Sequence, residues 1–178
     1  MRERLVTQSI IRGTVRPPGD KSISHRALIF NGITHGKVLI ENVSVGTDVN
    51  STIRCIRELG AKVEKSFNNN GELIIRLTGT GSKTLNEPSN VLNTGNSGTT
   101  MRLLAGLLAS QSFFSVLTGD KSLRSRPMGR IIEPLKRMGA KVIARDSNSK
   151  PPLVIVGGEL SGIDHISKVA SAQVKSAI

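Results

Sequence analysis

The stretch Ile56-Arg-Glu-Leu-Gly-Ala-Lys-Val63 recurs later in the chain as Leu135-Lys-Arg-Met-Gly-Ala-Lys-Val142. The shared glycines, Gly60 and Gly139, lie 79 residues apart. In both copies a run with helical spacing ends at the glycine, which is the residue that most often closes a helix. An internal repeat of this length predicts that the chain folds from similar supersecondary units.

Reading outward from this motif gives the remaining elements of each unit. In the first copy we expect a helix at about Ser22–Gly32, a strand at Lys37–Val43, a helix that Thr47 or Asp48 caps and Gly60 closes, and two strands ending in Glu72–Thr78. In the second we expect a helix from Ser97 to about Ser110, a strand at Ser112–Thr118, a helix at about Pro127–Met138 that Pro134 bends, and two strands ending in Leu153–Val156. Each copy then reads β-α-β-α-β-β, an α/β (α+β) fold class.

A third copy begins near the C-terminus. Ser22, Ser97 and Ser171 open the first helix of successive copies at spacings of 75 and 74 residues. We therefore expect units at about residues 15–80, 85–158 and 165–178, with the third cut short. The chain is expected to be a piece of a longer protein.

The charge of the chain indicates an anionic ligand. Its 25 Lys and Arg against 13 Asp and Glu give a formal charge of +12. Such a charge favours binding of an anionic ligand or partner. Nucleic acid is one candidate, but the chain has no Trp, no Tyr and four Phe, and single-strand binders use aromatic platforms. A small, highly charged substrate or an acidic partner domain fits better.

Other classes of protein find little support. No apolar run approaches the roughly 20 residues of a membrane span, and the N-terminus lacks the apolar core of a signal peptide. The single cysteine, Cys55, excludes an internal disulfide and is expected to be a buried thiol. Together with the three His it shows no metal-ligand spacing. We expect no metal, no cofactor and a cytoplasmic location.

Small and polar residues precede the first helix of every copy. These segments are Pro18-Gly-Asp-Lys-Ser-Ile-Ser-His-Arg26, Asn93-Thr-Gly-Asn-Ser-Gly-Thr-Thr-Met-Arg102 and Ser171-Ala-Gln173. A helix N-terminus favours an anion, Lys21 adds a point charge, and Arg26 adds a planar fork. If the units surround a pseudo-threefold axis, the three N-termini converge on one multiply anionic ligand. Alone, each segment is equally an ordinary cap or turn, and neither of the first two has P-loop spacing.

A further basic segment is Thr118-Gly-Asp-Lys-Ser-Leu-Arg-Ser-Arg-Pro-Met-Gly-Arg130. Arg126 precedes a proline, which restricts its backbone, so we choose it as a carboxylate clamp. Arg124 and Arg130 are also compatible with a solvated surface. His25 and His35 could act as bases, but nothing in the sequence pairs them with a carboxylate, and a core or surface role is more common.

Taken together, these segments resemble the EPSP synthase (3-phosphoshikimate 1-carboxyvinyltransferase) family. The matching segments, in order, are Gly19-Asp-Lys-Ser-Ile-Ser-His-Arg26, Gly95-Asn-Ser-Gly-Thr-Thr-Met-Arg102, Arg126-Pro-Met and Ser171-Ala-Gln173. The resemblance implies the inside-out α/β barrel of the enolpyruvyl transferases: two domains, each of three β-α-β-α-β-β units, with the active site between them. Residues 15–178 would be an incomplete N-terminal domain. A strand within residues 1–14, about Leu5–Ile11, would pair with the C-terminal domain.

The resemblance also implies a reaction and its residues. The enolpyruvyl group of phosphoenolpyruvate would move to the 5-hydroxyl of shikimate 3-phosphate by addition and elimination, in aromatic amino-acid biosynthesis. Lys21 would be catalytic and contact both substrates. The implied ligands of shikimate 3-phosphate are Lys21, Ser22, Arg26, Ser171 and Gln173. Those of phosphoenolpyruvate are Lys21, Asn96, Gly98, Arg126 and Gln173.

The sequence departs from the family pattern at two positions, and two alternative functions remain. Ala172 replaces a serine of some members, and Leu103 replaces a proline. The family's carboxylate bases lie in the C-terminal domain, so this chain alone is expected not to turn over. The rivals are the related UDP-N-acetylglucosamine enolpyruvyl transferase, which uses a cysteine on a mobile loop, and a basic nucleic-acid-binding module.

Overall fold

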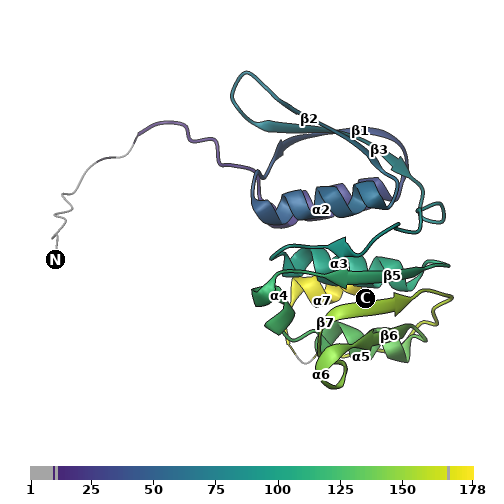
Figure 1. Ribbon diagram of the computed structural model, residues 1–178. Helices are drawn as coiled ribbons and strands as arrows, with labels where there is room; N and C mark the ends of the chain where they lie inside the picture. The colour runs from purple at the N-terminus through teal and green to yellow at the C-terminus, as the bar shows by residue number, and fades with distance from the viewer. Residues whose placement is uncertain (1–9, 11, 168) are drawn as a thin grey trace.

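The computed structural model describes residues 10, 12–167 and 169–178. They form two sheets covered by helices (Figure 1), which confirms the predicted mixed α/β class. No helix in the described part of the chain is long and apolar enough to cross a membrane.

The first copy of the repeat builds a three-stranded antiparallel sheet. Its elements are α1 (Lys21–Gly32), β1 (His35–Val43), α2 (Thr47–Glu58), β2 (Lys62–Phe67) and β3 (Leu73–Thr80). Strand β3 lies in the middle, where Leu77 pairs with Val38 of β1 and Val63 of β2. Because successive side chains of a strand alternate between faces, Leu73, Ile75 and Leu77 of β3 lie on one face, which is buried and packs against α1.

The second copy builds a four-stranded sheet of order β4-β5-β7-β6. Its elements are β4 (Leu92–Asn93), α3 (Gly98–Ala109), β5 (Phe114–Thr118), α4 (Lys121–Ser125), α5 (Gly129–Arg137), β6 (Lys141–Ala144), the turn-like α6 (Arg145–Asn148) and β7 (Lys150–Val156). Helix α7 (Ala172–Ala177) follows, at the start of the third copy. Strand β4 runs parallel to β5, and the other pairings are antiparallel.

The repeated motif has the same backbone conformation in both copies. Gly60 and Gly139 have positive φ angles of 104° and 100°, a region that favours glycine. The next residue in each copy, Ala61 or Ala140, donates its N–H to a carbonyl in the last turn of the helix. In each copy the motif therefore ends the helix and leads directly into the next strand.

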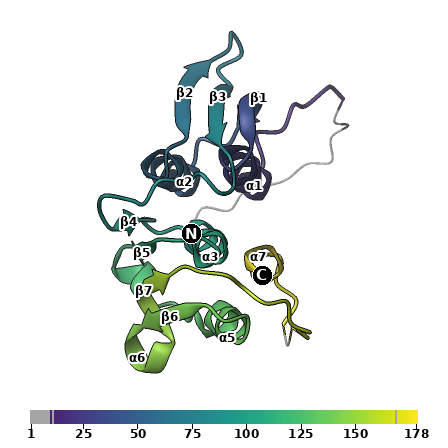
Figure 2. The ribbon, with the colours of Figure 1, turned by 90° about the vertical axis from the view of Figure 1, so that its right-hand side faces the viewer.

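Helices α1, α2 and α3 lie between the two sheets (Figure 2). Figure 2 looks nearly along α1, α2, α3 and α7, with the first sheet beyond α1 and α2 and the second beside α3. Helix α3 is central and packs against α1, α2, α5 and α7. A Cβ on Gly106 would lie 1.9 Å from the carbonyl oxygen of Ala177, so α7 packs directly on the α3 backbone.

The structure differs from the sequence-based expectation in several places. Helix α2 has Gly46 at its N-cap and no side-chain hydrogen bond there, so neither Thr47 nor Asp48 caps it. The first copy has no opening strand among the described residues, since residues 12–20 are irregular. Apart from Ile10, the strand expected at Leu5–Ile11 lies outside the described residues. The expected loop before α5 contains the short helix α4, and α5 begins at Gly129 rather than Pro127 because Arg126 and Pro127 are not helical. Pro134 lies inside α5 and is buried.

Candidate functional site

Helix α1 begins with a capping sequence that occurs twice in the chain. Asp20 accepts a hydrogen bond from the N–H of Ile23 at 2.7 Å. The same tetrapeptide, Gly-Asp-Lys-Ser, recurs at residues 119–122, where Asp120 caps α4 by accepting from the N–H of Leu123 at 2.7 Å. The tetrapeptide is thus a cap in both places, and the surroundings of Lys21 are set by the helix that it opens.

Two cationic side chains of α1 reach the neighbouring helices. Lys21 Nζ lies 3.1 Å from Asp48 Oδ2 on α2. Arg26 Nη2 donates to Ser176 Oγ at 2.8 Å and to the carbonyl of Ala172 at 3.2 Å. Arg26, expected to present its fork to an anion, therefore also joins α1 to α7. Ser22 is exposed beside it.

The N-terminus of α3 brings two guanidinium groups together. Ser97 caps the helix by accepting from the N–H of Thr100 at 3.1 Å, and Gly98 is the first helical residue. A Cβ on Gly98 would lie 2.6 Å from Arg102 Nη1 and 3.4 Å from Arg126 Nη1. Both guanidinium groups therefore lie close to residue 98, where a side chain would displace them.

A chain of polar side chains holds Arg126 near Gly98. Arg126 Nη2 donates to Asn96 Oδ1, and Asn96 Nδ2 donates to Asp120 Oδ2 at 2.6 Å. The pKa of Asp120 is lowered first by the hydrogen bond from the Leu123 N–H and then by that from Asn96. Asp120 therefore orients Asn96, and Asn96 orients Arg126.

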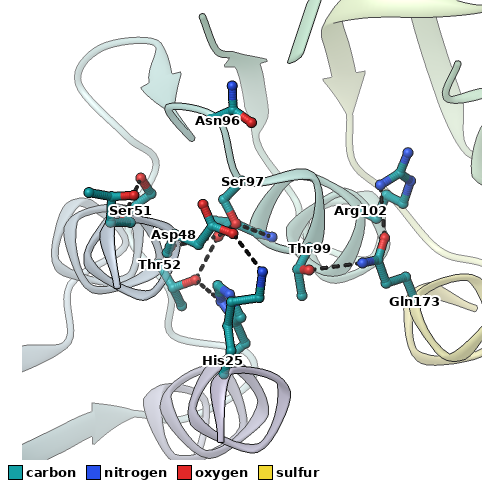
Figure 3. A network of polar contacts seen from close by, with 12 residues as sticks. His25, Asp48, Ser51, Thr52, Asn96, Ser97, Thr99, Arg102 and Gln173 are labelled. Atoms are coloured by element: carbon teal, nitrogen blue, oxygen red, sulfur yellow. Dashed lines mark hydrogen bonds and ion pairs between the residues drawn. The ribbon is translucent and has the colours of Figure 1, made fainter. Parts of the chain in front are cut away.

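Gln173, on the first turn of α7, bridges to α3. Its Oε1 accepts from Arg102 Nη1 at 2.8 Å, and its Nε2 donates to Thr99 Oγ1 at 2.9 Å (Figure 3). Ser171 caps α7 by accepting from the N–H of Val174 at 3.4 Å. The N-terminal turns of α3 and α7 are thereby joined.

Beneath these residues, a buried polar chain crosses three helices (Figure 3). His25 Nδ1 lies 2.6 Å from Thr52 Oγ1, which lies 2.7 Å from Thr100 Oγ1. Thr100 Oγ1 in turn donates to Ser97 Oγ at 2.7 Å. All four side chains are buried, so this series of hydrogen bonds fixes α1, α2 and α3 to one another.

Burial keeps His25 neutral. It lowers the pKa of His25 from 6.5 to about 4; the charge of Asp48 opposes this change, while Lys21 and Arg26 add to it. Between these two values the unfolded chain binds more protons than the folded chain. The stability that comes from keeping His25 neutral is therefore complete above about pH 6.5 and is lost as the pH falls towards about 4.

We expect His25→Gln to remove this part of the pH dependence. Wild type should lose up to about 3 kcal/mol more unfolding free energy than His25→Gln between pH 7 and pH 4. Urea unfolding of both proteins at the two pH values measures the difference. Equal losses in the two proteins would show that folding does not change the pKa of His25.

The site carries an excess of positive charge. Burial lowers the pKa of Arg102, and the nearby charges of Arg126 and Arg130 lower it further. In the described part of the chain, no carboxylate lies within ion-pair distance of these three arginines. A desolvated guanidinium such as that of Arg102, with the charges of two further arginines nearby, favours an anionic ligand.

The structure brings together most of the residues predicted from sequence. Asn96, Gly98 and Arg126 lie together around the start of α3. Gln173 joins α7 to this region, and Arg26 joins α1 to α7. Ser22 and Ser171 lie at the starts of α1 and α7 without a side-chain contact to the other helices among the described residues.

The sequence prediction omitted two charged members of the site. Arg102 falls within the quoted Gly95–Arg102 segment, one turn after Gly98, and this spacing could have indicated that both lie on one face. Asp48 was considered only as a helix cap, and no local pattern predicts its contact with Lys21. Among residues 10, 12–167 and 169–178, no group of three or more His, Cys, Asp or Glu could hold a metal ion.

Comparisons with known proteins give a consistent result. The family model described as EPSP synthase (3-phosphoshikimate 1-carboxyvinyltransferase) matches residues 6–178. The 3-phosphoshikimate 1-carboxyvinyltransferase of Pelotomaculum thermopropionicum is 53% identical over 168 residues, which are 94% of this chain and 38% of the relative. That of Magnetococcus marinus is 52% identical over 168 residues, which are 94% of this chain and 37% of the relative.

A solved structure agrees with this match. EPSP synthase from Acinetobacter baumannii superposes with a TM-score of 0.83 at 44% identity, over 93% of this chain and 37% of that one. The chain therefore spans little more than a third of the length of these relatives.

Proposed function

We propose that this chain, which belongs to the EPSP synthase family, supplies part of a site that binds shikimate 3-phosphate and phosphoenolpyruvate. The observation that carries the proposal is that the guanidinium groups of Arg102 and Arg126 both lie close to Gly98. Lys21 reaches the same turn of α3 through Asp48, whose carbonyl accepts a hydrogen bond from Thr100. Two multiply anionic substrates suit such a concentration of cations and free helix N–H groups.

Shikimate 3-phosphate is assigned to the side of the site formed by α1 and α7. Lys21 and Ser22 open α1, and Arg26 already spans the gap to α7. Ser171 and Gln173 face it from the start of α7. Lys and Arg donors form the stronger, charge-assisted hydrogen bonds to phosphate oxygens.

Phosphoenolpyruvate is assigned to the start of α3. The N–H of Gly98 and the Arg126 guanidinium, which Asn96 orients, would bind its carboxylate and phosphate. Gln173 contacts Arg102 and Thr99 of the same helix, and Lys21 would reach both substrates.

The proposed reaction is transfer of the enolpyruvyl group to the 5-hydroxyl of shikimate 3-phosphate. C3 of phosphoenolpyruvate takes a proton while the hydroxyl loses its own proton and its oxygen bonds to C2. Loss of a proton from C3 and of phosphate from C2 then gives 5-enolpyruvylshikimate 3-phosphate. Lys21 is the catalytic residue proposed here: its ammonium stabilises negative charge on the phosphate as the intermediate forms and breaks down.

Rival functions fit less well. The UDP-N-acetylglucosamine enolpyruvyl transferase uses a cysteine on a mobile loop, whereas Cys55 is buried in α2 and burial raises its pKa to about 12. A buried neutral thiol is a poor nucleophile. A nucleic-acid-binding module predicts salt-dependent binding of an arbitrary oligonucleotide that excess shikimate 3-phosphate does not displace.

The proposal assigns the acid–base chemistry to a C-terminal domain and the protein to the cytoplasm. We expect the 178-residue chain to bind shikimate 3-phosphate saturably in calorimetry and to bind shikimate, which lacks the phosphate, at least about tenfold more weakly. With both substrates it should release no phosphate above background. Equal affinity for the two ligands would contradict the proposed phosphate site. Phosphate release would contradict the assignment of the acid–base chemistry to a C-terminal domain.

A further inference from the structure

Asp48 introduces a negative charge into an otherwise cationic site. Its Oδ2 lies 3.1 Å from Lys21 Nζ. Asp120, the other carboxylate near the arginines, is occupied by its cap and by Asn96. In the described part of the chain no hydrogen bond to Asp48 Oδ1 is found.

The position of Asp48 does not depend on Lys21. It lies in the first turn of α2, where the helix dipole favours a carboxylate. Its backbone carbonyl accepts from Thr100 Oγ1 at 3.4 Å, and one turn later Thr52 is fixed between His25 and Thr100. The backbone that carries the carboxylate therefore stays at the site when the lysine side chain moves.

The ion pair itself is easily opened. The Lys21 side chain is 56% exposed and that of Asp48 is 26% exposed, and exposed pairs of this kind contribute little stability. An arriving phosphate group can therefore compete with Asp48 for the ammonium. It must do so in the presence of the carboxylate, which repels it.

We propose that Asp48 is an internal counter-ion of Lys21 that lowers the affinity of the site for bare anions. This role rests on the proposed function, because it assumes that Lys21 binds the anion. The carboxylate holds Lys21 in place while the site is empty and is exchanged for the phosphate when the ligand binds. The consequence is selectivity: a bare phosphate only replaces one anionic partner by another, whereas a larger ligand gains additional contacts on α3 and α7.

Inorganic phosphate is the probe that tests the role of Asp48. Asp48→Asn keeps the shape of the side chain and removes its charge. We expect this variant to bind phosphate about three- to tenfold more tightly than wild type, from the loss of one nearby charge, measured from the amide shifts of Lys21 and Gly98 during titration. Asp48→Ser, an independent variant with a small polar side chain, should tighten binding similarly. Damage to the fold would weaken binding, so a gain cannot arise from it.

Two further variants make the test specific. Asp146→Asn removes the carboxylate of another lysine pair, Asp146–Lys150 at 2.7 Å, and should leave phosphate affinity unchanged. In the double variant Lys21→Gln/Asp48→Asn the gain should disappear. Unchanged or weaker binding by Asp48→Asn, or a gain that persists without Lys21, would overturn the counter-ion role. No binding of shikimate 3-phosphate by wild type would instead contradict the proposed function itself.

Discussion

We expect Lys21→Ala to lower the affinity of the chain for shikimate 3-phosphate by about ten- to a hundredfold. The substitution removes a charge-assisted hydrogen bond, worth about 1.5–3 kcal/mol, from the phosphate. The cap of α1 is formed by Asp20 and not by Lys21, so the helix should remain intact. Calorimetric titration of the variant and wild type measures the difference.

The chain contains a matched control for this substitution. Lys121 follows Asp120 in the second Gly-Asp-Lys-Ser sequence, at the start of α4, and is exposed. Lys121→Ala removes the same charge from the same local sequence and should change the affinity less than twofold. If both variants bind like wild type, the pocket does not include Lys21. If both lose affinity equally, the effect comes from net charge and not from a site.

We expect Gly106→Ala to detach α7 from α3. The added Cβ would lie 1.9 Å from the Ala177 carbonyl oxygen, a distance that requires the backbones to separate. Overpacking of this kind costs about 1–3 kcal/mol, although alanine is the better helix former by up to about 1 kcal/mol. Separation of α7 would also withdraw Gln173 from Arg102 and Thr99.

Hydrogen exchange of the α7 amides and the affinity for shikimate 3-phosphate measure this effect. The variant should exchange faster at Val174 and Ala177, which are buried in wild type, and should bind the ligand several-fold more weakly. Gly129→Ala is the control, because a Cβ on this helical glycine meets nothing within 4 Å. Unchanged exchange at α7 would show that the contact between α3 and α7 is looser than the structure indicates.

Local chemistry explains why much of the fold could be predicted. The repeated Gly-Ala-Lys-Val sequence requires a positive φ at the glycine and buries the alanine and the valine that follow, and both copies do so. The serines chosen as helix starts, Ser97 and Ser171, cap α3 and α7. These features depend on residues a few positions apart, within reach of sequence patterns.

The contacts that assemble the site depend on tertiary packing instead. Lys21 and Asp48 are 27 residues apart, and Arg102 and Gln173 are 71 apart. His25 was expected in a core or surface role because no carboxylate accompanies it in the sequence. The structure places it in the core, where its partner is a hydroxyl of α2, and no periodicity identifies such a partner.

The starts of α1, α3 and α7 are proposed here to form a single anion-binding site. The most direct test is a titration of the 15N-labelled chain with shikimate 3-phosphate, followed through its backbone amide shifts. We expect saturable shifts with one common dissociation constant at Lys21, Ser22, Gly98 and Gln173. Shifts confined to other surfaces, or different dissociation constants at the three helix starts, would contradict it.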